Sequence, residues 1–124
     1  SLFLGLYEEV VRRNPKDPEA LDSVWFVQRV ADIERTDWTL SLRLYIRFDL
    51  FVQAFLGEQS GSLYFALIEG GRRIFGIDRE ADEWHLHPYD APNEHRSLPV
   101  GLGPKPLLKF LTQVEDLLLE YSLL

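Results

Sequence analysis

The stretch WTLSLRLYIRFD, residues 38–49, constrains the fold most narrowly because apolar and polar side chains alternate along its whole length. Successive side chains of a β-strand point to opposite faces of the sheet, so a period of two predicts a strand with one buried face and one wet face. The side chains expected on the buried face are Trp38, Leu40, Leu42, Leu44, Ile46 and Phe48. The alternation therefore predicts a sheet that is covered on one side only.

Further strands are predicted on both sides of this stretch, because short apolar runs are separated by turn-forming residues. The runs are VWFVQRVADIE before it and LFVQAFL, SLYFALIE, RRIFGID and EWHLHP after it. Gly70 and Gly71 lie between two of these runs, and paired glycines are typical of a tight hairpin. Short connections between consecutive strands favour an antiparallel meander of five or six strands.

Helices are predicted at both ends of the chain. Apolar residues recur at helical spacing in residues 1–14, before Pro15, and again in residues 106–124. Residues 88–106 are rich in proline and glycine and are predicted to be a loop. We therefore expect a single α+β domain over residues 1–124, in which a curled antiparallel five- to six-stranded meander sheet carries an N-terminal and a C-terminal helix on one face.

Composition excludes several classes of protein. The formal net charge of the 124-residue chain is −7, which disfavours non-selective binding of nucleic acid through charge alone. The chain has no cysteine, which excludes disulfides and thiolate zinc sites. Its apolar runs are too short to span a membrane, and its first residues do not form a secretory signal, so a cytoplasmic location is the default expectation.

Basic residues on the wet face of the central strand form a candidate binding surface. Arg43, Tyr45 and Arg47 alternate with the buried positions, and Arg72 and Arg73 lie in a neighbouring hairpin. Arginines interleaved with a tyrosine can bind phosphate and stack bases, so this face is a candidate RNA-binding surface. The same residues are also typical of a solvated sheet face whose charges deter edge-to-edge pairing.

All three histidines of the chain lie within the stretch WHLHPYDAPNEH, residues 84–95. On a strand that ends before Pro88, His85 and His87 share the wet face, and Trp84 and Leu86 the buried one. His95 then returns on the following loop. A rigid strand end beside a loop is a common place for a functional site.

Four interpretations of these histidines fit the residues. Three imidazoles can hold a divalent metal ion and leave one position open for water. Without a metal, His85 and His87 can act as general base and general acid in phosphodiester cleavage, supported by His95 and Arg73. The loop can also serve only to bind a partner. Alternatively, the histidines can be structural and satisfy hydrogen bonds to loop backbone or to carboxylates such as Asp90.

Other residues have both a functional and a structural interpretation. Asp78 can orient an arginine or a histidine, or it can cap a turn. Gly76 marks a bulge, a close approach of backbone, or only a weakened strand. The tryptophans are expected to anchor the core, and they are Trp25, Trp38 and Trp84.

The stretch FALIEGGRRIFGIDREADEWHLHPYDAPNEH resembles the TumE-like toxin family of prokaryotic toxin–antitoxin systems. The resemblance covers residues 38–120, mainly residues 63–95. An Arg-x-aromatic-x-x-Asp segment and a histidine-bearing segment carry it, through Arg73, Phe75, Asp78, His85, His87 and His95. The histidines here have the order His-x-His-Pro, whereas the family has a Pro-His-x-His arrangement.

The resemblance implies a small α+β toxin that acts on RNA and is neutralised by a cognate antitoxin protein. With the histidine cluster, it favours a ribonuclease that needs no metal cofactor. Two other expectations stay open. One is a non-enzymatic module that docks a partner through its sheet face or an edge strand, and the other is a metal-binding domain with a three-histidine site for a divalent ion.

Overall fold

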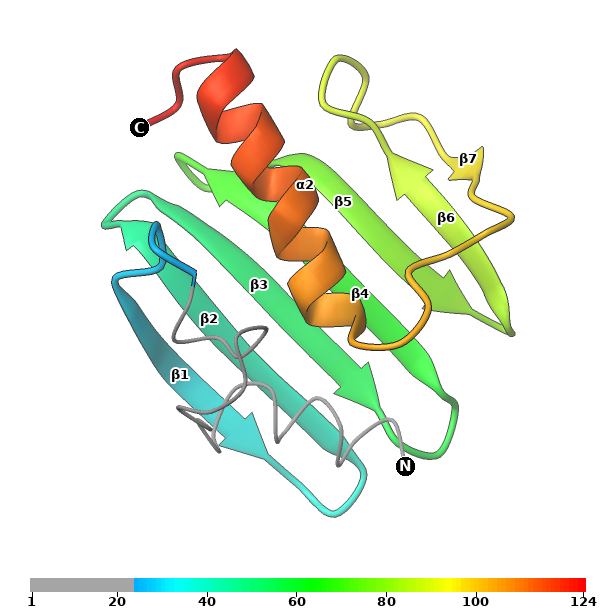
Figure 1. Cartoon of the computed structure of the whole chain (residues 1–124). Helices are drawn as coiled ribbons and strands as arrows, with labels where there is room; N and C mark the ends of the chain where they lie inside the picture. Colours follow the sequence, from blue (N-terminus) through cyan, green and yellow to red (C-terminus); the bar gives the residue numbers. More distant parts are fainter. Residues whose placement is uncertain (1–23) are drawn as a thin grey trace.

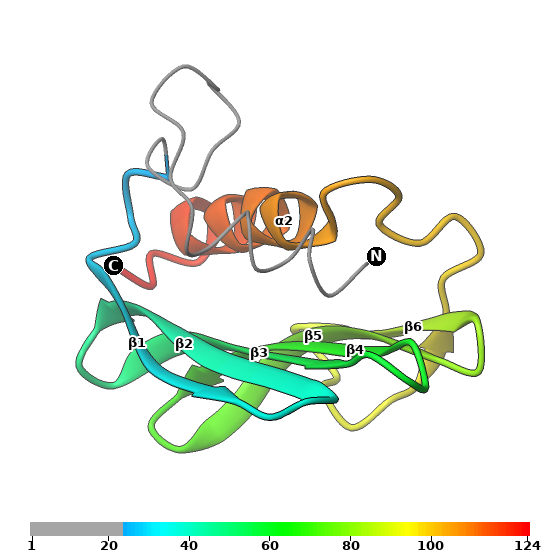
Figure 2. The same cartoon turned by 90° about the horizontal axis from the view of Figure 1, so that it is seen from below.

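The computed structural model describes residues 24–124, so the helix predicted in residues 1–14 lies outside the described part of the chain. Within residues 24–124, seven strands form one sheet in chain order, and every neighbouring pair is antiparallel. In the same range, one helix lies across one face of this sheet (Figures 1 and 2). The α+β class and the antiparallel meander are therefore confirmed.

Most elements lie close to the predicted positions, although β1 begins at Arg29 and the run predicted for it begins at Val24. The elements are β1 (Arg29–Arg35), β2 (Thr39–Arg47), β3 (Leu50–Gly57), β4 (Ser62–Glu69), β5 (Arg72–Glu80), β6 (Glu83–His87), β7 (Arg96–Ser97) and α2 (Pro106–Glu120). β7 exceeds the predicted five or six strands and lies within the segment expected to be a loop. It has only two residues, too few for an alternating pattern to show in the sequence.

The core lies between the sheet and α2. The predicted apolar row of β2 is buried there at Leu40, Leu42, Leu44 and Ile46. Its two end members were predicted wrongly, because Trp38 is 56% exposed and Phe48 is 89% exposed. Both lie just beyond the ends of β2, where strand alternation no longer fixes the direction of a side chain. Trp25 is also exposed and Trp84 is half-buried, so the tryptophans do not anchor the core as a group.

The helix α2 attaches to the sheet through one apolar stripe, as predicted. Phe110 is fully buried, and its ring centroid lies 5.3 Å from that of Phe65 and 5.4 Å from that of Phe75. Leu107, Leu111, Val114 and Leu118 extend the buried stripe along the helix. Burial of this stripe is what holds α2 on the sheet. Among residues 24–124, no helix combines the length and the apolar character that crossing a membrane requires.

A register shift between β2 and β3 determines which face Arg47 reaches. After Tyr45 one extra residue, Ile46, enters β2, so that Arg47 pairs with the core residue Leu50. A bulge of this kind sends the next side chain to the opposite face of the strand. Arg47 accordingly donates a hydrogen bond to the carbonyl oxygen of Leu123, beyond the end of α2. The sequence placed Arg47 beside Arg43 on the wet face, and this placement was wrong.

The face of the sheet opposite α2, here called the open face, carries Arg43, Phe51, Tyr64, Asp78 and His85. Each of them alternates along its strand with side chains that are buried in the core or packed against it. Their strand partners are likewise out of phase with the core, so the five side chains share one surface. The candidate site lies on this face, at its β5–β6 end.

Candidate metal centre

The hairpin of β5 and β6 brings a carboxylate beside a histidine on the open face. Asp78 pairs directly with His85, and Gly76 pairs with His87 two positions further along. The intervening pair, Ile77 and Leu86, points to the helix side, where Ile77 is fully buried. Strand alternation thus places Asp78, His85 and His87 on one face, as the sequence predicted for the two histidines.

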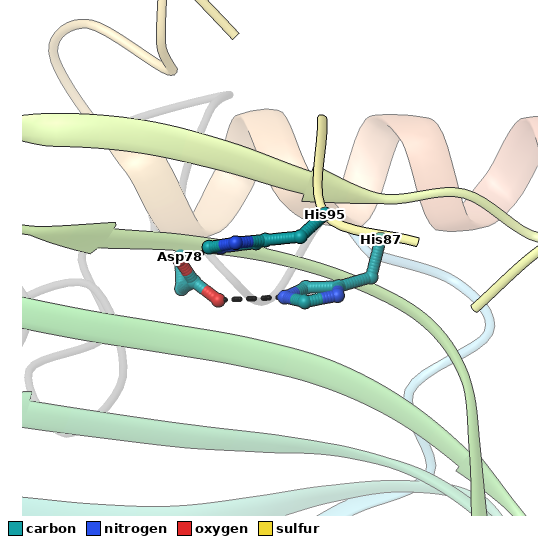
Figure 3. A group of neighbouring side chains, drawn as sticks. All are labelled: Asp78, His87 and His95. Atoms are coloured by element: carbon teal, nitrogen blue, oxygen red, sulfur yellow. Dashed lines mark hydrogen bonds and ion pairs between the residues drawn. The ribbon is translucent and has the colours of Figure 1, made fainter. Parts of the chain in front are cut away.

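The third histidine reaches the same place through the loop between β6 and β7. This loop, yellow in Figure 2, passes on the side of the sheet away from α2. The ring centroid of His95 lies 4.0 Å from that of His85 and 5.0 Å from that of His87. Figure 3 shows the rings of His95 and His87 one above the other, both beside Asp78. We call these four residues (Asp78, His85, His87 and His95) the Asp–His cluster.

His87 is the most constrained member of the Asp–His cluster. It was expected to face water, but it is only 9% exposed because the loop folds back over it. Its Nδ1 lies 2.9 Å from the carbonyl oxygen of Glu94. A carbonyl oxygen only accepts hydrogen bonds, so Nδ1 carries the proton and donates it. This hydrogen bond fixes the ring and leaves Nε2 as the free nitrogen.

The free nitrogen of His87 faces the carboxylate of Asp78. Nε2 lies 2.9 Å from Oδ2, and Asp78 is itself only 9% exposed. A ring that is protonated on Nδ1 alone has a lone pair on Nε2, and an ionised carboxylate offers only lone pairs. Two electron-rich atoms approach this closely when a cation lies between them, either a proton or a metal ion. The contact is therefore a hydrogen bond when one of the two atoms carries a proton, and it holds the carboxylate of Asp78 against the ring of His87.

The other carboxylate oxygen of Asp78 is approached by two more ring nitrogens. Nδ1 of His85 lies 3.4 Å from Oδ1. That nitrogen is buried, and no group in residues 24–124 forms a hydrogen bond with it. Nε2 of His95 lies 4.0 Å from the same oxygen, and the His95 side chain is 54% exposed. Together these contacts place three imidazole rings around the one carboxylate of Asp78.

Donor atoms of three members of the Asp–His cluster lie close together. One donor each from Asp78, His87 and His95 lies within 4.8 Å of the other two. In a tetrahedral zinc site, ligands about 2.0–2.2 Å from the ion stand about 3.3 Å from one another. The separations here run from 2.9 Å upward.

Three residues nominated from the sequence lie away from the Asp–His cluster. Arg47 reaches the helix side, and Arg72 pairs in register with Glu69 at the end of β5. Asp90 lies near Tyr121, where it assists the Glu120 carboxylate in raising the pKa of the Tyr121 phenol. These three residues therefore do not contribute to the Asp–His cluster.

Arg43 and Tyr45 lie on or beside the open face but on β2, three strands from the cluster. The Arg43 guanidinium lies 4.7 Å from the centroid of the Phe51 ring. A hydrogen bond from Arg43 to the Tyr45 hydroxyl raises the pKa of that guanidinium above its ordinary value. The hydroxyl in turn donates to Asp32 at 2.9 Å. The chain itself thus engages the groups that would otherwise contact RNA.

Two further features shape the site: the absence of a side chain at Gly76 and the backbone carbonyl of Glu94. A Cβ atom at Gly76 would lie 3.1 Å from the carbonyl oxygen of Phe65 and 3.3 Å from Cδ of Arg73. Glycine at position 76 therefore allows the carbonyl of Phe65 and the side chain of Arg73 to approach closely. A close approach of backbone was one of the three roles predicted for this glycine. The Glu94 contact comes from the backbone, which has the same chemistry at every residue and leaves no signal in the sequence.

Comparison with known proteins assigns this chain to no family. A scan against protein-family models finds no matching model, and searches of curated proteins and of solved structures find no match either. The likeness to TumE-like toxins stays a prediction.

Proposed function

We propose that this protein binds one divalent transition-metal ion through Asp78, His87 and His95. The observation that carries the proposal is the convergence of one donor atom each from Asp78, His87 and His95, which all lie within 4.8 Å of one another. Histidines that bind metals usually donate their second ring N–H to a carboxylate or to a backbone carbonyl. The hydrogen bond from His87 to the Glu94 carbonyl has this arrangement.

A proton alone explains less of the Asp–His cluster than a metal ion does. One proton satisfies the pair of Asp78 and His87, but it involves only one of the three imidazoles of the Asp–His cluster. It also gives no reason for His95 to lie over the other two rings. A metal ion uses the lone pair of His95 directly. In this arrangement His85 supports the site by stacking on His95 and by lying against the carboxylate.

The donor set indicates which ions fit. Two imidazoles and one carboxylate suit Zn²⁺ and the neighbouring first-row ions, whereas Mg²⁺ and Ca²⁺ prefer oxygen ligands only. Three protein ligands leave at least one position of the ion open. When bound, such an ion supplies a Lewis acid and lowers the pKa of a coordinated water. The half-exposed His95 places the open side toward solvent.

The proposal is tested by calorimetric titration of chelator-treated, full-length protein with Zn²⁺. We expect saturable binding of one ion per chain, and no comparable heat with Mg²⁺ because imidazole nitrogens disfavour it. Thermal unfolding in the same buffers provides a second readout, since a ligand that binds only the folded state raises Tm. Zn²⁺ that neither binds at one equivalent nor raises Tm would contradict the proposal.

A second candidate, ribonuclease action without a metal, has one observation in its favour. Asp78 contacts a ring nitrogen of His87 while His95 stays half-exposed beside it. A carboxylate that orients an imidazole is common in general acid–base catalysts. His95 is the member able to reach RNA, because both ring nitrogens of His87 are engaged. Combined with the TumE-like resemblance, this candidate is a cytoplasmic toxin with a cognate antitoxin.

The two candidates respond differently to a chelator when single-stranded RNA is offered as substrate. The acid–base candidate predicts cleavage that persists in EDTA and falls by about 100-fold or more in His95→Ala. The variant Asn93→Ala, on the same exposed loop, is the matched control and should cleave normally. Cleavage that stops in EDTA and returns with Zn²⁺ would assign the chemistry to the metal ion. An absence of cleavage under all these conditions would remove the ribonuclease candidate.

A further inference from the structure

A β-bulge between β4 and β5 turns one arginine onto the open face. Leu67 pairs with Phe75, but the next residue of β4, Ile68, pairs with Arg73, so Ile74 is an extra residue in β5. Without the bulge, Arg73 would share the helix side with Phe75. The bulge instead directs it to the face that carries Gly76 and His87. Bulges are frequent next to active sites, where they redirect a side chain.

The side chain of Arg73 runs past the Asp–His cluster. A Cβ atom built on Gly76 would lie 3.3 Å from Cδ of Arg73 and 3.7 Å from Cδ2 of His87, so the arginine stem and the imidazole flank the same glycine. One N–H of the guanidinium donates to the carbonyl oxygen of Pro92 at 3.1 Å. A guanidinium has five N–H groups, and Arg73 is an exposed residue. Its remaining donors are therefore available to a ligand.

Charges around the site favour an anion. A divalent ion bound to one carboxylate and neutral imidazoles has a net charge of +1, and Arg73 adds another positive charge. The nearby Glu94 carboxylate is paired with Arg96 at 2.6 Å, which offsets its charge. The other carboxylate in contact is that of Glu83, 3.8 Å from Nε2 of His85 and 78% exposed. With the proposed ion bound, the site would thus be locally positive on a chain whose formal net charge is −7.

We propose that the metal centre binds the phosphoryl group of a phosphate-bearing ligand, with Arg73 as its second contact. One phosphoryl oxygen occupies the open position of the ion, and another accepts hydrogen bonds from the guanidinium. The planar fork of arginine matches phosphate geometry, and a hydrogen bond between two charged groups is stronger than a neutral one. The inference rests on the proposed metal site and names the ligand class for it.

The test uses Co²⁺ as a spectroscopic substitute for Zn²⁺ in the full-length protein. With protein in excess over Co²⁺, the visible bands of the bound ion report first on metal binding and then on added inorganic phosphate. Methyl phosphate and dimethyl phosphate, titrated separately, distinguish monoester from diester ligands. We expect a saturable spectral change with at least one of the three probes.

The variant Arg73→Ala should weaken binding of that probe by about tenfold or more, because a hydrogen bond to a charged group is lost. Its Co²⁺ affinity should stay within about twofold of the wild type, since no metal ligand is changed. Arg73→Lys should recover part of the affinity, because it keeps the charge without the planar fork. The matched control is Arg72→Ala, the preceding residue, which pairs with Glu69 and lies on the other side of β5.

The outcomes separate this inference from the proposed metal site. Absence of Co²⁺ bands in the wild type overturns both the proposed metal site and the phosphoryl site. Bands that do not respond to any of the three phosphates, or a response that is equal in Arg73→Ala and Arg72→Ala, overturn only the phosphoryl site. A spectral response to phosphate that weakens in Arg73→Ala and not in Arg72→Ala supports the phosphoryl site.

Discussion

Replacing Asp78 by asparagine should lower the affinity of the chain for Zn²⁺ by about 100-fold or more. Loss of a group that merely supports a metal ligand already costs about 10–100-fold in affinity, and Asp78 is proposed to bind the ion directly. Asparagine has nearly the same shape, so the change removes the negative charge while it keeps the volume. Competition titration against a chelator of known affinity measures the difference.

The matched control for this variant is Asp90→Asn, which changes the net charge by the same amount. Asp90 is exposed and lies near Tyr121 rather than near the histidines. It should leave Zn²⁺ affinity within about twofold of the wild type, because screening weakens the effect of distant surface charges. Equal losses in the two variants would show that net charge, and not coordination, governs the binding.

Replacing Phe110 by alanine should lower the free energy of unfolding by about 3–5 kcal/mol. Phe110 is fully buried and its ring contacts those of Phe65 and Phe75, on β4 and β5. Removing it leaves a cavity between α2 and these two strands, one of which, β5, carries Asp78. Urea denaturation, followed by tryptophan fluorescence, measures the change in free energy.

Leu119→Ala is the control on the same helix, since Leu119 is 62% exposed and points away from the core. Its effect should stay within about 0.5 kcal/mol. If Phe110→Ala is no more destabilising than Leu119→Ala, then the stripe of α2 is not what holds the helix on the sheet. Zn²⁺ should raise the stability of both variants by similar amounts, because neither residue belongs to the Asp–His cluster.

The sheet could be predicted from the sequence wherever alternation was long and undisturbed. The row from Leu40 to Ile46 shows this, because each of its side chains had to be on the covered face once the strand was recognised. The bulges at Ile46 and Ile74 could not be predicted. A bulge depends on how a strand pairs with its neighbour, and the alternation in a single strand does not report the register of its partner.

The bulges explain why strict alternation misplaces two of the arginines. Arg47 was placed beside Arg43 on the wet face, but the bulge at Ile46 moves it to the helix side. Arg73 would follow Phe75 to the helix side by strict alternation, but the bulge at Ile74 brings it beside His87. A single inserted residue reverses the face of a side chain, so alternation alone misplaces the residue that precedes or follows a bulge.

The candidate site could be predicted in part, because strand periodicity alone put His85 and His87 on one face. Asp78 was recognised as a carboxylate able to orient a histidine, although its register with His85 became clear only from the pairing of β5 and β6. The return of His95 and the hydrogen bond to the Glu94 carbonyl depend on the path of the loop. A loop path is set by tertiary contacts, which short-range patterns do not contain.

The most direct test of the account is the position of the metal ion in a crystal of the Zn²⁺-loaded protein. Anomalous diffraction at the zinc absorption edge locates the ion independently of the protein model. We predict one strong anomalous peak per chain, about 2.0–2.2 Å from a carboxylate oxygen of Asp78 and from Nε2 of both His87 and His95. A peak elsewhere on the chain, or no peak between Asp78 and the histidines, would contradict the account.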